Sequence, residues 1–134
     1  MIHQENHDDQ RSKIIMRLLF TILIIAVAAG IAEWFAPWWT IAIVACIAGF
    51  VSRLSSGKAF LAGFCAIALL WLIFALWRDI PNQHILSARM AQLFKLPSYA
   101  LFIAVTSLLG GLIGGLATWS GAHLKRLLQP VGDY

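Results

Sequence analysis

Apolar residues occur in four long runs that short polar segments separate. The runs cover residues 14–35, about 38–52, 58–77 and 98–122. A helix needs about 20 apolar residues, at a rise of about 1.5 Å each, to cross the hydrocarbon core of a bilayer. Three runs are near that length and the second is shorter. The pattern predicts an all-α integral membrane protein with four transmembrane helices.

The segments outside the runs set the expected domain boundaries. The polar stretch 1–13, "MIHQENHDDQRSK", has no hydrophobic pattern and predicts a flexible cytoplasmic tail. Residues 14–126 would then form the four-helix transmembrane domain, and residues 127–134 a short C-terminal tail. Basic residues before an apolar core and the small residues "AVAAG" are also typical of a cleaved signal. We favour a retained span, because the run is long and acidic residues precede it.

The connection between the third and fourth runs predicts a short amphipathic helix at about 82–96. Asn82 follows Pro81 and is a suitable N-cap, and Pro97 ends the segment before the next run. Its apolar residues fall on one side of a helix: Leu86, Met90, Leu93 and Phe94. This pattern is typical of a helix that lies at the membrane interface.

The composition supports insertion into lipid. Apolar residue types make up 60% of the 134 residues and charged types 12%, against roughly 45–50% and 25% in soluble domains. Too few polar side chains are available to cover a water-exposed surface. The net charge of +4 comes from cations grouped beside the apolar runs, which does not indicate nucleic-acid binding.

The distribution of cations predicts the orientation. With a cytoplasmic amino terminus, seven cations fall inside and three outside, which favours both termini in the cytoplasm. The composition resembles that of small bacterial integral membrane proteins, so we expect the bacterial inner membrane. The inside set is Arg11, Lys13, Arg17, Arg53, Lys58, Lys125 and Arg126, and the outside set is Arg78, Arg89 and Lys95. The first outside turn contains Trp34, Trp38 and Trp39, which suit an aromatic belt.

The last run carries small residues on one helical face. Two overlapping Gly-x-x-x-Gly pairs lie at its centre, and the expected packing residues are Ser107, Gly110, Gly111, Gly114, Gly115 and Thr118. Small side chains let helix backbones approach closely in lipid, where apolar burial gives little drive for association. The face predicts a groove for another helix. That helix belongs either to this chain, whose other runs also carry small residues, or to a second copy or another membrane protein. Pore lining is a third reading, for which the face offers few polar groups.

A polar site is predicted at the outer rim of the membrane. Glu33 lies near the end of the first run, and Arg78 and Asp79 lie at the end of the third. An ionisable residue near the bilayer is a functional candidate. The alternatives are a cation- or proton-responsive carboxylate and a structural carboxylate held by Arg78 or by an indole N–H.

No catalytic, cofactor-binding or metal-binding residues are predicted. Cys46 and Cys65 lack the spacing of a metal or redox pair, and the four histidines form no zinc pattern. We therefore expect a non-enzymatic assembly or accessory subunit whose partners are the bilayer and a second copy or another membrane protein. The alternative is a small oligomeric channel or transporter with Glu33 at the rim, and an enzyme acting on lipid or quinone is a third class.

Overall fold

The computed structural model describes residues 2–35, 37, 39–52 and 54–128, with side chains from residue 8 onward. Within these residues the protein is all-helical, as the pattern predicts, and contains no strand. It has five helices: α1 (Ile2–Phe35), α2 (Thr40–Val51), α3 (Ser56–Asp79), α4 (Ile85–Leu93) and α5 (Tyr99–Leu128). The expected tail 127–134 begins inside α5, and its residues 129–134 lie outside the described residues.

Three of the helices are long and apolar enough to cross a membrane, rather than the four predicted. These are α1, from Asp8 onward, α3 and α5. The second run forms α2, whose 12 residues extend only about 18 Å at 1.5 Å per residue. Its limits have a local cause. Both the backbone N–H and the hydroxyl of Thr40 bond to the Pro37 carbonyl, and Ser52 adopts an extended backbone that ends the helix.

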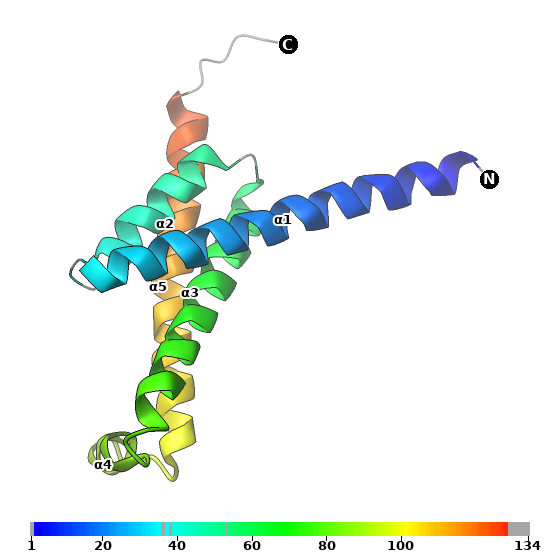
Figure 1. Cartoon of the computed structure of the whole chain (residues 1–134). Coiled ribbons are helices and arrows are strands. Elements are labelled where there is room, and N and C mark those ends of the chain that lie inside the picture. The colour runs from blue at the N-terminus through cyan, green and yellow to red at the C-terminus, as the bar shows by residue number, and fades with distance from the viewer. Residues whose placement is uncertain (1, 36, 38, 53, 129–134) are drawn as a thin grey trace.

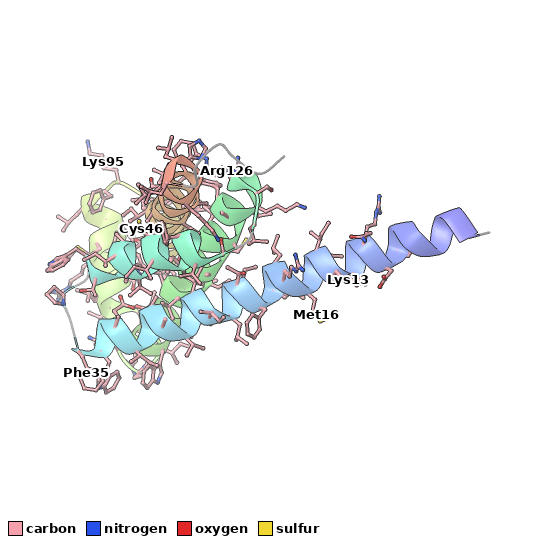
Figure 2. All side chains as sticks on the ribbon, turned by 90° about the horizontal axis from the view of Figure 1, so that it is seen from above. Lys13, Met16, Phe35, Cys46, Lys95 and Arg126 are labelled. Carbon is pink, nitrogen blue, oxygen red and sulfur yellow. The ribbon has the colours of Figure 1, made fainter. Side chains whose placement is uncertain are left out.

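The helices do not form a bundle of parallel rods. The connection through α4 makes α3 and α5 an antiparallel pair (Figure 1). Helix α1 runs across this pair, and the view from above shows α1 lengthwise while α5 is seen nearly end-on (Figure 2). Helix α2 lies between α1 and α5 and contacts both, whereas the described part of α1 does not contact α5.

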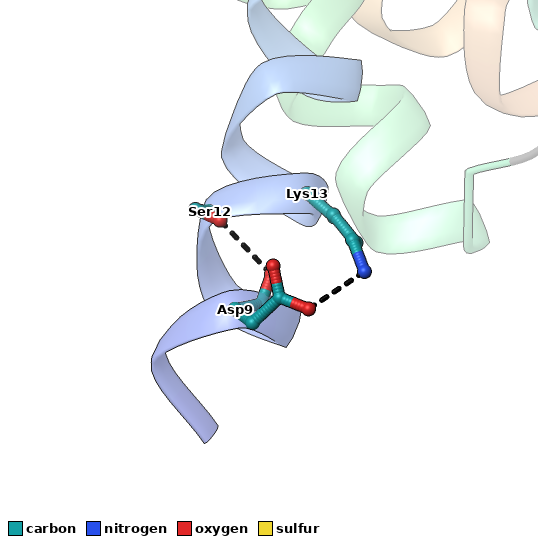
Figure 3. A network of polar contacts seen from close by, with 3 residues as sticks. All are labelled: Asp9, Ser12 and Lys13. Carbon is teal, nitrogen blue, oxygen red and sulfur yellow. Dashed lines mark hydrogen bonds and ion pairs between the residues drawn. The ribbon is translucent and has the colours of Figure 1, made fainter. Parts of the chain in front are cut away.

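The segment expected to be a flexible tail is helical from Ile2 onward, as a continuation of α1. Lys13 pairs with Asp9 at 2.7 Å, and the Ser12 hydroxyl donates to the Asp9 carbonyl at 2.9 Å (Figure 3). Exposed pairs of this spacing contribute at most about 0.5 kcal/mol. The first turns of α1 project beyond the other helices, as the positions of Lys13 and Met16 show (Figure 2).

A small apolar core joins α1, α2 and α3. Ile25 and Ala29 of α1 meet Ile41 of α2 and the pair Ala66 and Ile67 of α3, and all five are buried. The core fixes α1 by its C-terminal half alone. The side chains of residues 8–17 of α1 are exposed.

The short helix predicted at about 82–96 is present as α4, but it covers only Ile85–Leu93, and His84 rather than Asn82 is its N-cap residue. Its buried residues are Ser87 and Ala91, which face the rest of the protein. The predicted apolar side, including Leu86, Leu93 and Phe94, is exposed. Such an orientation suits a helix that presents its apolar side to lipid.

Candidate functional site

The small-residue face of α5 is buried against α3 and α2. All six residues expected on this face are among the buried residues of α5, which are Ile103, Ser107, Gly110, Gly111, Gly114, Gly115, Thr118, Gly121 and Ala122. The opposite side of the helix is exposed, as at Leu109, Leu112 and Leu116. The groove is therefore filled by helices of the same chain in this structure.

The closest approach of α3 and α5 occurs at Gly63 and Gly114. A Cβ atom added to Gly63 would meet the Thr118 hydroxyl and the Gly114 carbonyl oxygen. A Cβ atom added to Gly114 would meet Ile67 and lie 2.8 Å from the Gly63 carbonyl oxygen. Each glycine thus faces the backbone of the other helix, an arrangement that Cα–H···O contacts favour.

Thr118 lies where α2, α3 and α5 meet, and it is fully buried. Its carbonyl oxygen occupies the position that a Cβ of Gly49 on α2 would take, and its side chain lies against Gly63 on α3. The hydroxyl donates to the Gly114 carbonyl at 2.8 Å, so its polar atom is satisfied within α5. Gly121 meets the Cys46 carbonyl of α2 in the same way.

At the remaining glycines of the groove, α5 packs against side chains of α3. A Cβ at Gly110 would lie 2.6 Å from the Trp71 indole, and one at Gly115 would lie 2.8 Å from the Phe60 ring. Gly111 faces the Ala68 methyl group at 2.9 Å. The groove therefore combines close backbone contact in its middle with large side chains on either side.

Glu33 and Arg78, two of the three residues predicted at the outer rim, line one cavity of about 590 Å³. The cavity lies between α1 and α3, reaches Thr106 of α5, and has aromatic walls from Trp34, Trp71, Phe74 and Trp77. Glu33 and Arg78 form no ion pair with each other among the described residues. The Glu33 Oε2 atom and the Trp71 Nε1 atom are both buried and, within the described chain, lack a hydrogen-bond partner.

Asp79, the third predicted rim residue, does not join this cavity. Its Oδ2 atom lies 2.5 Å from Nδ1 of His84, and its Oδ1 atom accepts a hydrogen bond from the Ser87 hydroxyl. The His84 ring stacks on Tyr99 with centroids 4.4 Å apart. This cluster, which we call the Asp79 clamp, joins the end of α3 to α4 and the start of α5.

The Asp79 clamp has the chemistry of a structural link. Gln83 and His84 have positive φ angles of 52° and 60°, and this turn brings His84 back to Asp79. The carboxylate contacts both the imidazole and the hydroxyl, whereas an activated serine requires the imidazole to stand between hydroxyl and carboxylate. The described contacts therefore do not form a nucleophile–base relay.

Sequence reasoning missed Ser87 and Trp71 as members of these sites, and it considered His84 beside Asp79 only for a possible enzyme site. His84 and Ser87 follow Asp79 across an irregular turn, so no helical or strand spacing relates them. Trp71 lies inside an apolar run and gives no separate signal there. The only available indication was its indole N–H, which needs a partner when buried.

A second cavity of about 660 Å³ lies between α1 and α2. Its lining is mostly apolar, with Phe20, Ile24 and Ala28 on α1 and Val44 and Ala48 on α2, and Arg17 and Ser52 lie at one end. We call this the α1–α2 groove. It borders the half of α1 that projects from the other helices (Figure 2).

No protein-family model, curated protein or solved structure matches the chain. The fold and composition define an all-helical protein with three helices that are long and apolar enough for membrane insertion.

Proposed function

We propose that the protein is a small multi-pass membrane protein that acts as a non-enzymatic assembly or accessory subunit and binds another membrane protein through α1. One observation carries this proposal. Only 11% of the most apolar part of α1 is buried, compared with 28% in α3 and 33% in α5. Helix α1 thus has the largest free surface of the three long helices.

Helix α1, rather than α5, has an apolar surface that is free for a partner. The glycine face of α5 is occupied by α3 and α2, so it offers no groove to a partner. Along α1, the side chains of Leu19, Phe20, Leu23 and Val27 are more than half exposed. A helix partner that fits the α1–α2 groove would gain the close contacts that drive association in lipid.

For the topology we propose four membrane crossings, with both termini in the cytoplasm of a bacterial cell. The cations near one end of the α3–α5 pair support this orientation. Lys125 donates to the Ser52 carbonyl at 3.2 Å, and Arg17 lines the same cavity as Ser52. Trp38 and Arg53 lie outside the described residues. Helix α2 would cross with the help of its flanking residues and local thinning of the bilayer.

Site-specific photo-crosslinking tests the accessory role. A photoreactive residue at Leu23, which is 60% exposed on α1, is compared with one at Leu109, which is 55% exposed on α5. In native membranes we expect Leu23 to yield a discrete protein adduct that mass spectrometry assigns to one membrane protein or to a second copy. Leu109 should yield lipid adducts alone. Lipid adducts alone from both positions would contradict the proposal.

A small channel or transporter remains the second candidate, and the buried Glu33 Oε2 atom beside a cavity favours it. A liposome flux assay with Glu33→Gln as control addresses it directly. Ion or solute flux that depends on Glu33 would support transport and would count against the accessory role.

A further inference from the structure

Two of the residues that line the cavity beside Glu33, namely Glu33 and Trp71, each carry a buried polar atom without a hydrogen-bond partner among the described residues. Oε2 of Glu33 is an acceptor without a donor, and Nε1 of Trp71 is a donor without an acceptor, as far as the described residues show. Both atoms are buried, and a buried polar atom without a partner destabilises the protein. Arg78 lines the same cavity and makes no ion pair among the described residues.

These groups define the ligand that would satisfy them. Glu33 requires a cationic group with N–H donors, and the surrounding aromatic faces also attract a cation. The Trp71 N–H requires a hydrogen-bond acceptor, and the Arg78 guanidinium at the cavity edge is well suited to bind an oxyanion. A ligand with a primary ammonium close to a phosphate supplies both groups. A trimethylammonium group would fit the aromatic walls but has no N–H to donate to Glu33.

The position of the cavity indicates the source of such a ligand. Arg78, which lines the cavity, immediately precedes Asp79 near the end of α3. At this point a spanning helix would leave the hydrocarbon region. Trp34 and Trp77 are largely exposed beside it, as expected of tryptophans at the headgroup level. Its volume of about 590 Å³ is within the range of small-molecule sites, roughly 300–1,000 Å³.

We propose that this cavity binds the headgroup of an ethanolamine phospholipid. The ammonium group bonds to Glu33 and packs between the aromatic rings, and the phosphate accepts hydrogen bonds from Trp71 and Arg78. Thr106 lies at the α5 side of the same cavity. The inference does not depend on the accessory role, because lipid binding here leaves the exposed face of α1 free.

Native mass spectrometry of the purified full-length protein tests the assignment. The protein is titrated with phosphatidylethanolamine, phosphatidylcholine and phosphatidylglycerol of identical acyl chains. We expect phosphatidylethanolamine to bind about tenfold more tightly than the other two, because only it supplies both an N–H donor and a phosphate to the unpaired groups. Equal retention of the three lipids would overturn the proposal.

Variants test which residues carry the preference. Glu33→Gln should reduce the preference for phosphatidylethanolamine over phosphatidylcholine severalfold. Arg78→Gln should weaken the binding of both lipids. Arg89→Gln, an exposed cation of α4 away from the cavity, is the matched control and should change neither. An effect of Arg89→Gln equal to that of Glu33→Gln would overturn the assignment of the site.

A soluble competitor separates a lipid from a free solute. Glycerophosphoethanolamine carries the same headgroup without acyl chains and should bind at least a hundredfold more weakly than the lipid. Equal binding would show that the cavity recognises a soluble zwitterion, and the lipid assignment would fail. Arg78 is exposed at the cavity edge, so Arg78→Gln remains informative even where Glu33→Gln lowers the yield of folded protein.

Discussion

Adding one methyl group at Gly63 is expected to lower the free energy of unfolding by about 3 kcal/mol, the upper part of the range for overpacked sites. The added Cβ would meet the Thr118 hydroxyl and the Gly114 carbonyl oxygen. A backbone oxygen cannot move aside by a change of rotamer, so α3 and α5 must separate. The denaturation midpoint of Gly63→Ala, followed by circular dichroism in detergent, measures this loss.

Gly57→Ala is the matched control for this substitution. It lies on the same helix, and an added Cβ meets no atom within 4 Å. Alanine is a better helix former than glycine by up to about 1 kcal/mol, so Gly57→Ala should be neutral or stabilising. Gly111→Ala should fall between the two, because the added Cβ would meet the Ala68 Cβ, which is fixed to its backbone, and the Phe64 ring, which can shift. Equal midpoints for Gly63→Ala and Gly57→Ala would contradict the proposed packing.

The second large effect is expected at the Asp79 clamp. Asp79→Ala removes the acceptor for both the His84 ring and the Ser87 hydroxyl, and Asp79 is only 5% exposed. Hydrogen bonds to a charged group contribute about 1.5–3 kcal/mol each, and we expect a loss of about 3 kcal/mol. Hydrogen exchange should rise in α4 and the first turn of α5, because the clamp joins these segments to α3.

Asp79→Asn and Asp9→Ala complete this test. Asparagine keeps an oxygen for Ser87 and has a similar shape. Asp79→Asn should therefore lower the free energy of unfolding less than Asp79→Ala does. Asp9 is exposed on the projecting part of α1, and Asp9→Ala should change stability by less than about 0.5 kcal/mol. An Asp79→Ala protein with unchanged hydrogen exchange in α4 would show that the clamp does not hold that helix.

The sequence predicted the helices well where the pattern was local. Three apolar runs correspond to α1, α3 and α5, and the amphipathic segment corresponds to α4. The small residues of the last run fall on the buried side of α5 because helical periodicity alone determines which residues share a face. The second run, recognised as the shortest of the four, forms a helix of only 12 residues, since Thr40 and Ser52 limit α2 through contacts and backbone angles that hydropathy does not encode.

The features that depend on tertiary structure could not be predicted from the sequence. The steep crossing of α1 over the α3–α5 pair arises from packing around Ile25 and Ala29, and no periodicity reports a crossing direction (Figure 1). Glu33 and Arg78 do share a cavity, whereas Asp79 turns away to His84 and Ser87. Neighbouring positions on α3 point in different directions, so adjacency in sequence did not place Arg78 and Asp79 in one site.

The most direct test asks which helix fills the groove of α5. Ala68→Cys and Gly111→Cys are combined in a protein whose Cys46 and Cys65 are replaced by alanine. An added Cβ of Gly111 lies 2.9 Å from the Ala68 Cβ, and a small shift reaches the roughly 3.5–4.5 Å of a disulfide. The outward pair Leu69→Cys and Leu112→Cys, both exposed, is the control and should not cross-link within the chain.

Light and heavy isotope-labelled proteins are expressed separately, mixed before reconstitution, oxidised in membranes and digested. We predict disulfide-linked peptides that are entirely light or entirely heavy, because α3 and α5 of one chain form the pair. Mixed light–heavy peptides at about half of the total would show that a second copy fills the groove, and absence of the disulfide would show that α3 does not face Gly111. Either result would contradict the packing on which this account depends.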